Sequence, residues 1–178
     1  LGEYQESYAF SKVLYDDNKT PYIVARDVQI RREAFKPSTA YMLVDVLKDC
    51  VSGSSGTGSR AKFGGFTVAG KTGTNSDACG VFFAGMTAYY SCAVWIGHDN
   101  YKPLVSNATG GTYAAPLWAA VMSQVHSYAG ITKDRAIISG SASDYGLVLA
   151  EACGVSGMRP TDSCRRDANG YSVTRDYY

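Results

Sequence analysis

The sequence lacks a long apolar run, an excess of charge and any cysteine spacing that holds a metal. No uninterrupted apolar stretch approaches the ~20 residues that a bilayer-spanning helix needs. Lysine and arginine total 17 against 16 aspartate and glutamate, so the net charge of +1 provides no basic cluster for nucleic acid. None of the five cysteines lies at the two-residue spacing of a zinc knuckle. We therefore predict no metal, no cofactor and no nucleic-acid partner.

What is present indicates one folded domain. Hydrophobic residues make up 46% of the 178-residue chain, which is enough to bury one sizeable core but hardly two. The chain begins with Leu1-Gly2-Glu3-Tyr4, which is neither an initiator methionine nor a signal segment. We therefore expect a piece of a longer protein, with any targeting or anchoring segment outside it.

The first sixty residues predict a hairpin and then a helix. Aromatic and β-branched residues at 8–15 and 22–24 flank an Asx-rich turn, which is typical of an antiparallel hairpin. Pro37 suits the first turn of a helix, and the glycine- and serine-rich stretch 53–59 must be a loop. Between them, apolar residues recur at helical spacing: Ala40, Leu43, Val44, Leu47 and Val51.

Three strands and a second long helix are predicted next. Residues 66–74 are β-prone at their start, and strands at 81–86 and 90–96 are separated by only three residues. So short a link forces an antiparallel hairpin. The helix is expected at 114–128. Its apolar face is predicted to contain Leu117, Val121 and Val125, widened by Trp118 and Met122. The predicted fold class is α+β: an antiparallel sheet with this helix packed on one face.

The candidate site is Lys71-Thr72-Gly73-Thr74, at the end of the first of these strands. On a sheet edge beside a cleft, lysine offers a cation, threonine hydroxyls offer hydrogen-bond donors, and glycine lets a ligand approach the backbone. That combination suits a ligand with a carboxylate next to an amide. A Lys-Thr-Gly tripeptide also arises by chance in ordinary strand ends, so only its sequence context can indicate whether it is a binding site.

That context resembles the class A, bifunctional penicillin-binding proteins. Lys-Thr-Gly is the third signature element of penicillin-binding proteins and class A β-lactamases. The order and spacing of four segments match: residues 69–75, 83–85, 93–100 and 109–118. Further similar segments lie at 39–48, 56–61, 153–157 and 160–164. The resemblance implies the C-terminal part of a transpeptidase domain, whose complete sheet has five strands with helices on both sides.

The resemblance also implies an activity and roles for the four site residues. Members are serine acyltransferases that cross-link peptidoglycan stem peptides at a D-Ala-D-Ala bond and are acylated by β-lactams. Lys71 would aid proton transfer and attract the substrate carboxylate. The hydroxyls of Thr72 and Thr74 would bind that carboxylate, and Gly73 would keep the strand accessible. The Thr74 N–H would be one of two oxyanion-hole donors.

The partners implied in this way are D-Ala-D-Ala stem peptides, β-lactam antibiotics and the remaining upstream half of the domain. The expected location is the extracytoplasmic face of the bacterial membrane, with the anchor outside this chain. We assign residues 1–130 to the transpeptidase domain, without its nucleophile region, and residues 131–178 to a C-terminal extension.

Two other signature elements are missing. No Ser-x-Asn triplet occurs, and the only Ser-x-x-Lys, at Ser59-Arg60-Ala61-Lys62, follows a Gly-Thr-Gly loop instead of beginning a buried helix. We expect the true nucleophile upstream of Leu1 and the chain alone to be inactive. Two alternatives stay open: a serine β-lactamase, and a degenerate transpeptidase fold that serves as a non-catalytic binding module. Hydrolysis of a β-lactam and the upstream sequence would distinguish them.

The remaining reactive residues have structural interpretations. Cys153 and Cys164 flank a turn-rich stretch that would let them approach each other, and whether they are bonded stays open. Cys50, Cys79 and Cys92 are interpreted as small core residues. Trp95 and Trp118 are interpreted as core anchors, and His98 and His126 as surface or packed residues.

Overall fold

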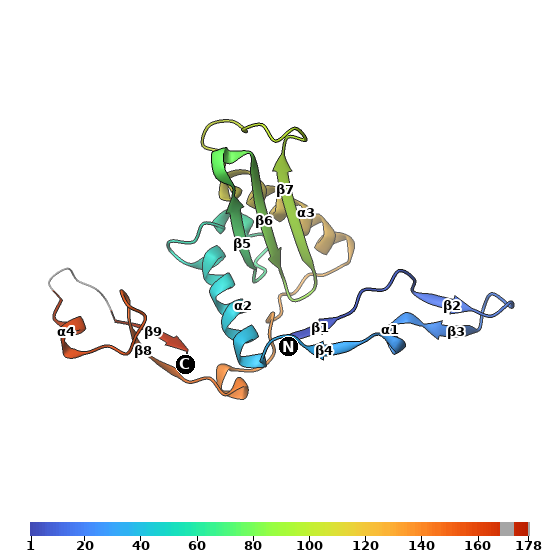
Figure 1. Cartoon of the computed structure of the whole chain (residues 1–178), viewed down its shortest axis with the longest axis horizontal. Coiled ribbons are helices and arrows are strands. Elements are labelled where there is room, and N and C mark those ends of the chain that lie inside the picture. Colours follow the sequence, from blue (N-terminus) through green and yellow to red (C-terminus); the bar gives the residue numbers. More distant parts are fainter. Residues whose placement is uncertain (168–172, 178) are drawn as a thin grey trace. The chain divides into compact units, whose positions relative to one another are not determined.

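The computed structural model describes residues 1–167 and 173–177 (Figure 1). It contains two compact units, Leu1–Ala40 and Tyr41–Tyr178. Within the described residues, no helix combines the length and the apolarity that crossing a membrane demands. In the same residues, no group of three or more histidine, cysteine, aspartate or glutamate side chains could hold a metal ion.

The first unit consists of two short antiparallel ribbons. β1 (Glu3–Gln5) pairs with β4 (Arg31–Glu33), and β2 (Lys12–Leu14) pairs with β3 (Pro21–Val24), which leads into α1 (Ala25–Val28). The Asp17 carboxylate closes the turn between β2 and β3 by accepting the N–H groups of Lys19 and Thr20 at 2.9 and 2.8 Å. The predicted hairpin is therefore confirmed, although its first strand begins at Lys12.

The helix predicted from Pro37 is confirmed as α2 (Pro37–Ser52). It ends where the glycine- and serine-rich loop begins, as expected. Of its apolar row, Val51 is buried in the core, whereas Leu43 is 53% exposed. A short 3-10 turn, η1 (Ser59–Ala61), follows the loop.

The central sheet has three antiparallel strands in the order β5-β6-β7. These are β5 (Ala69–Thr74), β6 (Gly80–Met86) and β7 (Ser91–Gly97), with the 3-10 turn η2 (Ser76–Ala78) between the first two. Each strand lies within three residues of its predicted bounds. The pairs Thr72–Phe83 and Phe83–Val94 fix the register, so these three side chains share the face that packs on the core.

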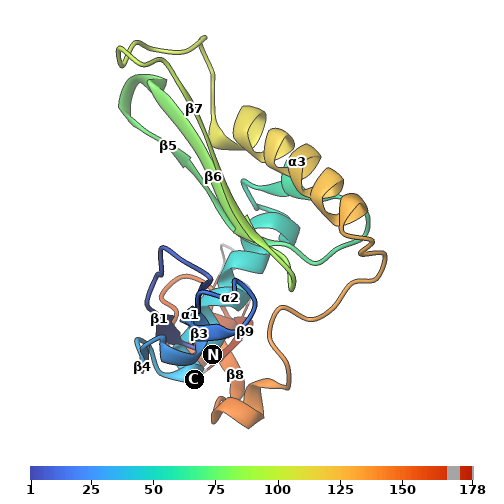
Figure 2. The same cartoon turned by 90° about the vertical axis from the view of Figure 1, so that its right-hand side faces the viewer.

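The second long helix, α3 (Ala115–Tyr128), runs along one face of this sheet (Figure 2). It is preceded by a π-helical turn, η3 (Gly110–Ala114). The helix is confirmed, and so is the burial of Trp118 and Met122, but the placement of Leu117, Val121 and Val125 on the buried face is wrong. The buried row is Trp118, Met122 and His126, each at most 1% exposed. Leu117, Val121 and Val125 are between 37% and 46% exposed.

Hydrogen bonding, as well as apolar area, determines which residues of α3 are buried. Trp118 donates its Nε1–H to the Cys92 carbonyl at 2.9 Å, and its ring meets Phe83 with centroids 5.1 Å apart. The His126 ring is satisfied at both nitrogens, by Thr87 at 3.0 Å and by the Met122 carbonyl at 2.8 Å. A polar side chain with both partners supplied is buried at little cost. His126 is thus a packed residue, as predicted.

Trp95 is not the predicted core anchor. Strand alternation directs it to the sheet face opposite α3, where it is 49% exposed and contacts Phe82 at a ring separation of 6.4 Å. The core-anchor prediction is confirmed for Trp118, which is fully buried. Of the three cysteines predicted in the core, Cys79 is buried, while Cys50 and Cys92 are half-buried.

The last described segment begins with a 3-10 turn, η4 (Ala142–Tyr145). β8 (Leu149–Cys153) then pairs antiparallel with β9 (Val173–Tyr177), and α4 (Asp162–Arg165) lies between them in the sequence. The extension predicted at 131–178 includes residues 168–172 and 178, which lie outside the described residues.

Candidate functional site

The Lys71–Thr74 segment occupies one edge of the central sheet. β6 pairs with one side of β5, and no strand among the described residues pairs with its other side. Lys71 and Thr74 are exposed, and Thr72 and Gly73 are half-buried. The segment therefore lies on an unpaired strand edge, with Lys71 and Thr74 accessible to a ligand.

The hydrogen-bond pattern of β5 determines which backbone groups face that open edge. The Asn75 N–H donates to the Gly80 carbonyl at 3.1 Å, which makes this pair a hydrogen-bonded one. Bonded and non-bonded pairs alternate in an antiparallel ladder. The N–H and C=O groups of Thr72 and Thr74 therefore point away from β6, toward the open edge. Lys71 Nζ donates to the Thr72 carbonyl at 2.8 Å, so the ammonium lies at the same edge.

A second segment, the Gly-Thr-Gly loop at residues 56–58, reaches β5 through one side chain. The hydroxyls of Thr57 and Thr72 lie 2.6 Å apart. The Gly58 N–H donates to the Cys50 carbonyl at 2.8 Å, which holds the loop against the end of α2. At Gly56 a Cβ would lie 2.4 Å from the same carbonyl oxygen, so only glycine fits there. The two glycines thus let the loop fold tightly enough to present Thr57 to the strand.

A third segment, Thr109–Thr112, contacts β5 from the start of η3. The Gly110 N–H donates to Thr74 Oγ1 at 3.1 Å. A Cβ on Gly110 would lie 2.3 Å from the Phe82 carbonyl oxygen and 2.7 Å from that of Gly73, which no side chain permits. Thr109 and Thr112 form a reciprocal capping box that fixes this turn.

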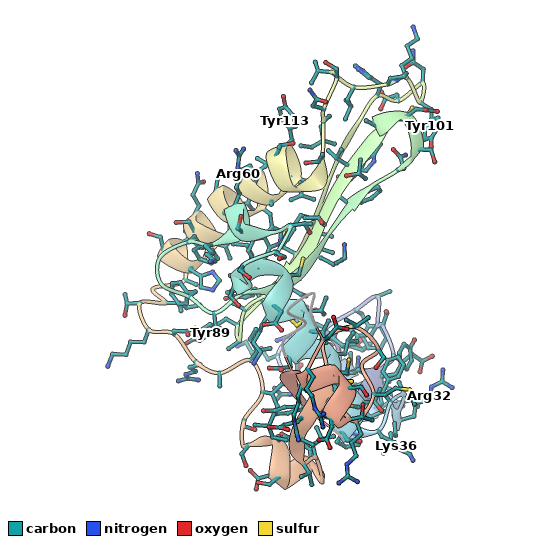
Figure 3. All side chains as sticks on the ribbon, turned by 90° about the vertical axis from the view of Figure 1, so that its left-hand side faces the viewer. Arg32, Lys36, Arg60, Tyr89, Tyr101 and Tyr113 are labelled. Carbon is teal, nitrogen blue, oxygen red and sulfur yellow. The ribbon has the colours of Figure 1, made fainter. Side chains whose placement is uncertain are left out.

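Arg60 joins the loop segment to the turn segment. Its Nη1 donates to the Thr112 carbonyl at 3.4 Å, and Figure 3 shows Arg60 and Tyr113 on the flank of the molecule formed by η1 and the start of α3. Two stretches far apart in the sequence, residues 56–60 and 109–112, therefore meet at the Lys71–Thr74 strand, and each supplies a hydrogen bond to one of its threonine hydroxyls.

Lys71 borders a hollow of about 580 Å³ at the end of α2. Val46, which is 64% exposed, lies on its helical wall. Cys50 also lines this hollow, and its Sγ contacts the Thr57 hydroxyl at 3.5 Å. The remaining lining residues are Leu47, Asp49, Gly53, Ser54, Ser55, Gly56 and Thr57.

The formal Ser-x-x-Lys sequence has a different geometry from a serine and lysine one turn apart on a long helix. Ser59 begins the single 3-10 turn η1, and Lys62 already has an extended backbone with φ −67° and ψ 136°. Both residues are exposed. The backbone thus turns away from a helix between them.

The sequence did not reveal the partners of the two threonine hydroxyls, Thr57 and Gly110. Both belong to segments already noted as similar to the family, which was the available signal. Their contacts with β5 span 15 and 36 residues of sequence, and no local pattern reports such pairs.

The fold is that of a penicillin-binding transpeptidase. The crystal structure of penicillin-binding protein 1A from Haemophilus influenzae superposes with a TM-score of 0.65 and 15% identity, over 99% of this chain and 29% of that one. At that identity the likeness concerns the fold. The family model "Penicillin binding protein transpeptidase domain" matches residues 5–123, and the chain therefore belongs to this family.

Curated relatives agree with this assignment. Penicillin-binding protein 1A of Clostridium botulinum (strain Langeland) is 33% identical over 183 residues, covering 99% of this chain and 20% of the relative. The protein of that name from Clostridium acetobutylicum is 40% identical over 121 residues, covering 68% of this chain and 14% of the relative. The chain thus spans about a fifth of the length of the first of these relatives. The resemblance inferred from the motifs is confirmed.

Proposed function

We propose that this chain forms the substrate-binding side of a peptidoglycan D,D-transpeptidase site, whose serine nucleophile lies in polypeptide outside it. The observation that carries the proposal is the open edge of β5. There the Lys71 ammonium, two threonine hydroxyls and two outward-facing backbone N–H groups lie on four consecutive residues. This set matches the terminal carboxylate and the neighbouring amide of a D-Ala-D-Ala peptide.

The orienting contacts support a donor role for both threonine hydroxyls. Thr74 Oγ1 accepts the Gly110 N–H, which leaves its proton free for a substrate carboxylate. If Thr57 donates to Thr72, the Thr72 proton is free in the same way. Lys71 adds a positive charge beside them, and a charge-assisted hydrogen bond to a carboxylate is about twice as strong as a neutral one.

The reaction proceeds by two acyl transfers. The serine oxygen attacks the carbonyl carbon of the penultimate D-Ala and loses its proton, which Lys71 helps to move toward the leaving amine. The Thr74 N–H and the N–H of the serine itself stabilise the oxyanion. The C–N bond then breaks and D-Ala leaves. An amine of a second stem peptide attacks the ester, restores the serine hydroxyl and forms the cross-link. A β-lactam enters by the first step and remains as the acyl adduct.

On this proposal the domain works on the extracytoplasmic face of the bacterial membrane, where its peptidoglycan substrate is, with the anchor outside this chain.

A chimera tests the proposal. This chain replaces the matching segment of the Clostridium botulinum relative, and fluorescent penicillin is applied to the chimera and to the chain alone. We expect a long-lived adduct on the chimera and none on the isolated chain. Lys71→Ala should slow acylation of the chimera by about tenfold or more, because a hydrogen bond to a charged group contributes about 1.5–3 kcal/mol.

Two substitutions serve as matched controls. Lys62→Ala removes another exposed lysine nearby, and Ser59→Ala removes the formal serine; both should leave labelling unchanged. Labelling of the isolated chain at Ser59 would show that the nucleophile is misplaced. Rapid release of the fluorophore would indicate a β-lactamase, and a folded chimera that is never labelled would indicate a non-catalytic binding module.

A further inference from the structure

Cys153, at the end of β8, and Cys164, on α4, are within hydrogen-bond reach of each other. Both elements belong to the end of the chain coloured orange to red in Figure 1. The Cys153 N–H donates to the Met158 carbonyl, and the Gly157 N–H donates to the Cys153 carbonyl, both at 2.8 Å. These bonds close a tight loop directly after β8. The chain then returns through Pro160 to α4, which carries Cys164.

An ion pair holds α4 against β8 beside the two cysteines. Arg165 Nη2 lies 2.8 Å from Glu151 Oε2. Glu151 is two residues before Cys153, so both side chains lie on the same face of β8. Arg165 directly follows Cys164 on α4. The pair therefore links the strand and the helical turn beside the two thiols.

The Cys153 thiol has the chemistry of a nucleophile. The N–H groups of Ser156 and Val155, then the Ser156 hydroxyl and the Cys164 thiol, hydrogen-bond its sulfur and lower the pKa of Cys153 to about 7. A substantial fraction of this sulfur is therefore thiolate at neutral pH, and the Cys164 thiol is within hydrogen-bond reach of it. Thiolate is the form that attacks a disulfide.

The segment between the cysteines has little else to stabilise it. Of residues 154–167, all but Pro160 and Cys164 are exposed. Ala152 and Cys153, at the end of β8, are 1% and 7% exposed. A segment that buries so little apolar surface gains little stability from packing, and in such segments a disulfide commonly supplies the missing stability.

We propose that Cys153 and Cys164 form an intramolecular disulfide that fastens α4 to the end of β8 when the protein meets an oxidant bearing a disulfide. The Cys153 thiolate attacks one sulfur of the oxidant, and one thiolate leaves. The Cys164 thiol then loses its proton to solvent, attacks the Cys153 sulfur and expels the second thiolate of the oxidant. Two S–H groups are lost, one S–S bond forms, and the oxidant is reduced to two thiols.

Peptide mapping tests this proposal on the whole chain. The reduced protein is exposed to oxidised glutathione, quenched with acid, alkylated and digested with trypsin without reduction. Both cysteines fall in one tryptic peptide, residues 136–165, because Arg159 precedes proline. We expect this peptide to carry no alkyl group and to weigh about 2 Da less than its reduced form. Cys50, Cys79 and Cys92 should be alkylated.

Matched variants make the outcome specific. Cys153→Ser and Cys164→Ser should each abolish the bond and leave a mixed disulfide with glutathione on the remaining cysteine. Cys92→Ser should leave the bond intact. If a variant does not fold, the map of the unmodified protein still decides. Two alkyl groups on peptide 136–165 after exposure to excess oxidant, two bound glutathiones, or a bond to any other cysteine would overturn the proposal.

Discussion

The hydroxyl oxygens of Thr57 and Thr72 lie 2.6 Å apart and join the loop after α2 to the middle of the edge strand β5. One proton lies between them, and each hydroxyl has only one to give. The Thr72 proton is available to a ligand only when Thr57 is the donor. A residue outside the Lys-Thr-Gly sequence therefore governs the donor capacity of a residue inside it.

Replacing Thr57 tests this relationship. In the chimera with the Clostridium botulinum relative, Thr57→Val should slow acylation by penicillin about fivefold, because a neutral hydrogen bond contributes about 1 kcal/mol. Thr57→Ser keeps the hydroxyl and should restore most of the rate. The second-order rate constant of labelling is the measurement, and equal rates for the valine and serine variants would contradict the donor role.

Gly110 should tolerate no side chain. A Cβ at this position would lie 2.3 Å from the Phe82 carbonyl oxygen. Gly110→Ala should therefore lower the free energy of unfolding by ~3 kcal/mol, which is the upper end of the usual cost of overpacking a core. Gly146→Ala is the comparison, because Gly146 has a φ of +72° and open space around it. It should cost only ~1 kcal/mol of backbone strain. Urea unfolding measures both variants. A loss of stability in Gly110→Ala no larger than in Gly146→Ala would show that η3 can shift to make room for the side chain.

The buried pair of Thr87 and His126 should contribute measurably to stability. Thr87→Val keeps the shape of the side chain and leaves His126 Nε2 without its partner at 3.0 Å. The expected loss is ~2 kcal/mol, the cost of one unsatisfied buried polar group. Thr132→Val alters an exposed threonine and should stay within about 0.5 kcal/mol of the unmodified chain. Thermal or urea unfolding of both variants is the measurement, and equal effects would contradict the burial argument.

The reactivity of Cys153 should depend on pH in a defined direction. Because its pKa is lowered to about 7 in the folded state, its alkylation by iodoacetamide in the reduced protein should be half-maximal near that pH. A pKa below that of the unfolded chain, which is about 8.5, means that the folded state releases its proton first. The ionisation of Cys153 therefore contributes to the free energy of unfolding in full above pH ~8.5. This contribution decreases as the pH falls from about 8.5 and is lost as the pH falls through about 7.

Ser156→Ala removes the hydroxyl that donates to Cys153 and should move the alkylation midpoint to higher pH. Its backbone N–H remains, so the shift should be partial. If the midpoint is the same as in the unmodified protein, the Ser156 hydroxyl does not contribute to the lowered pKa of Cys153.

Local patterns predicted most elements of this fold. Pro37 and the apolar spacing located α2, and the short 87–89 link fixed the β6–β7 hairpin, because both depend on neighbouring residues. Trp118 and Met122 were predicted on the buried face of α3, but His126 was left out of it because hydropathy ranks histidine below valine, whereas its burial follows the hydrogen bonds that Thr87 and Met122 supply. The family motifs located the site strand, but its contacts with Thr57 and Gly110 depend on folding. The boundary at residue 130 and the roles of Lys71 to Thr74 stay predictions.

The open edge of β5 has a consequence for handling the isolated chain. An unpaired strand is a template for a second copy, and the neighbouring sheet face exposes Phe82 and Trp95. Lysine on an edge strand is a common means of preventing such pairing. Lys71 is therefore expected to keep the chain dispersed in solution as well as to attract a carboxylate. Light scattering should accompany every substitution at this position, so that precipitation is not taken for lost binding.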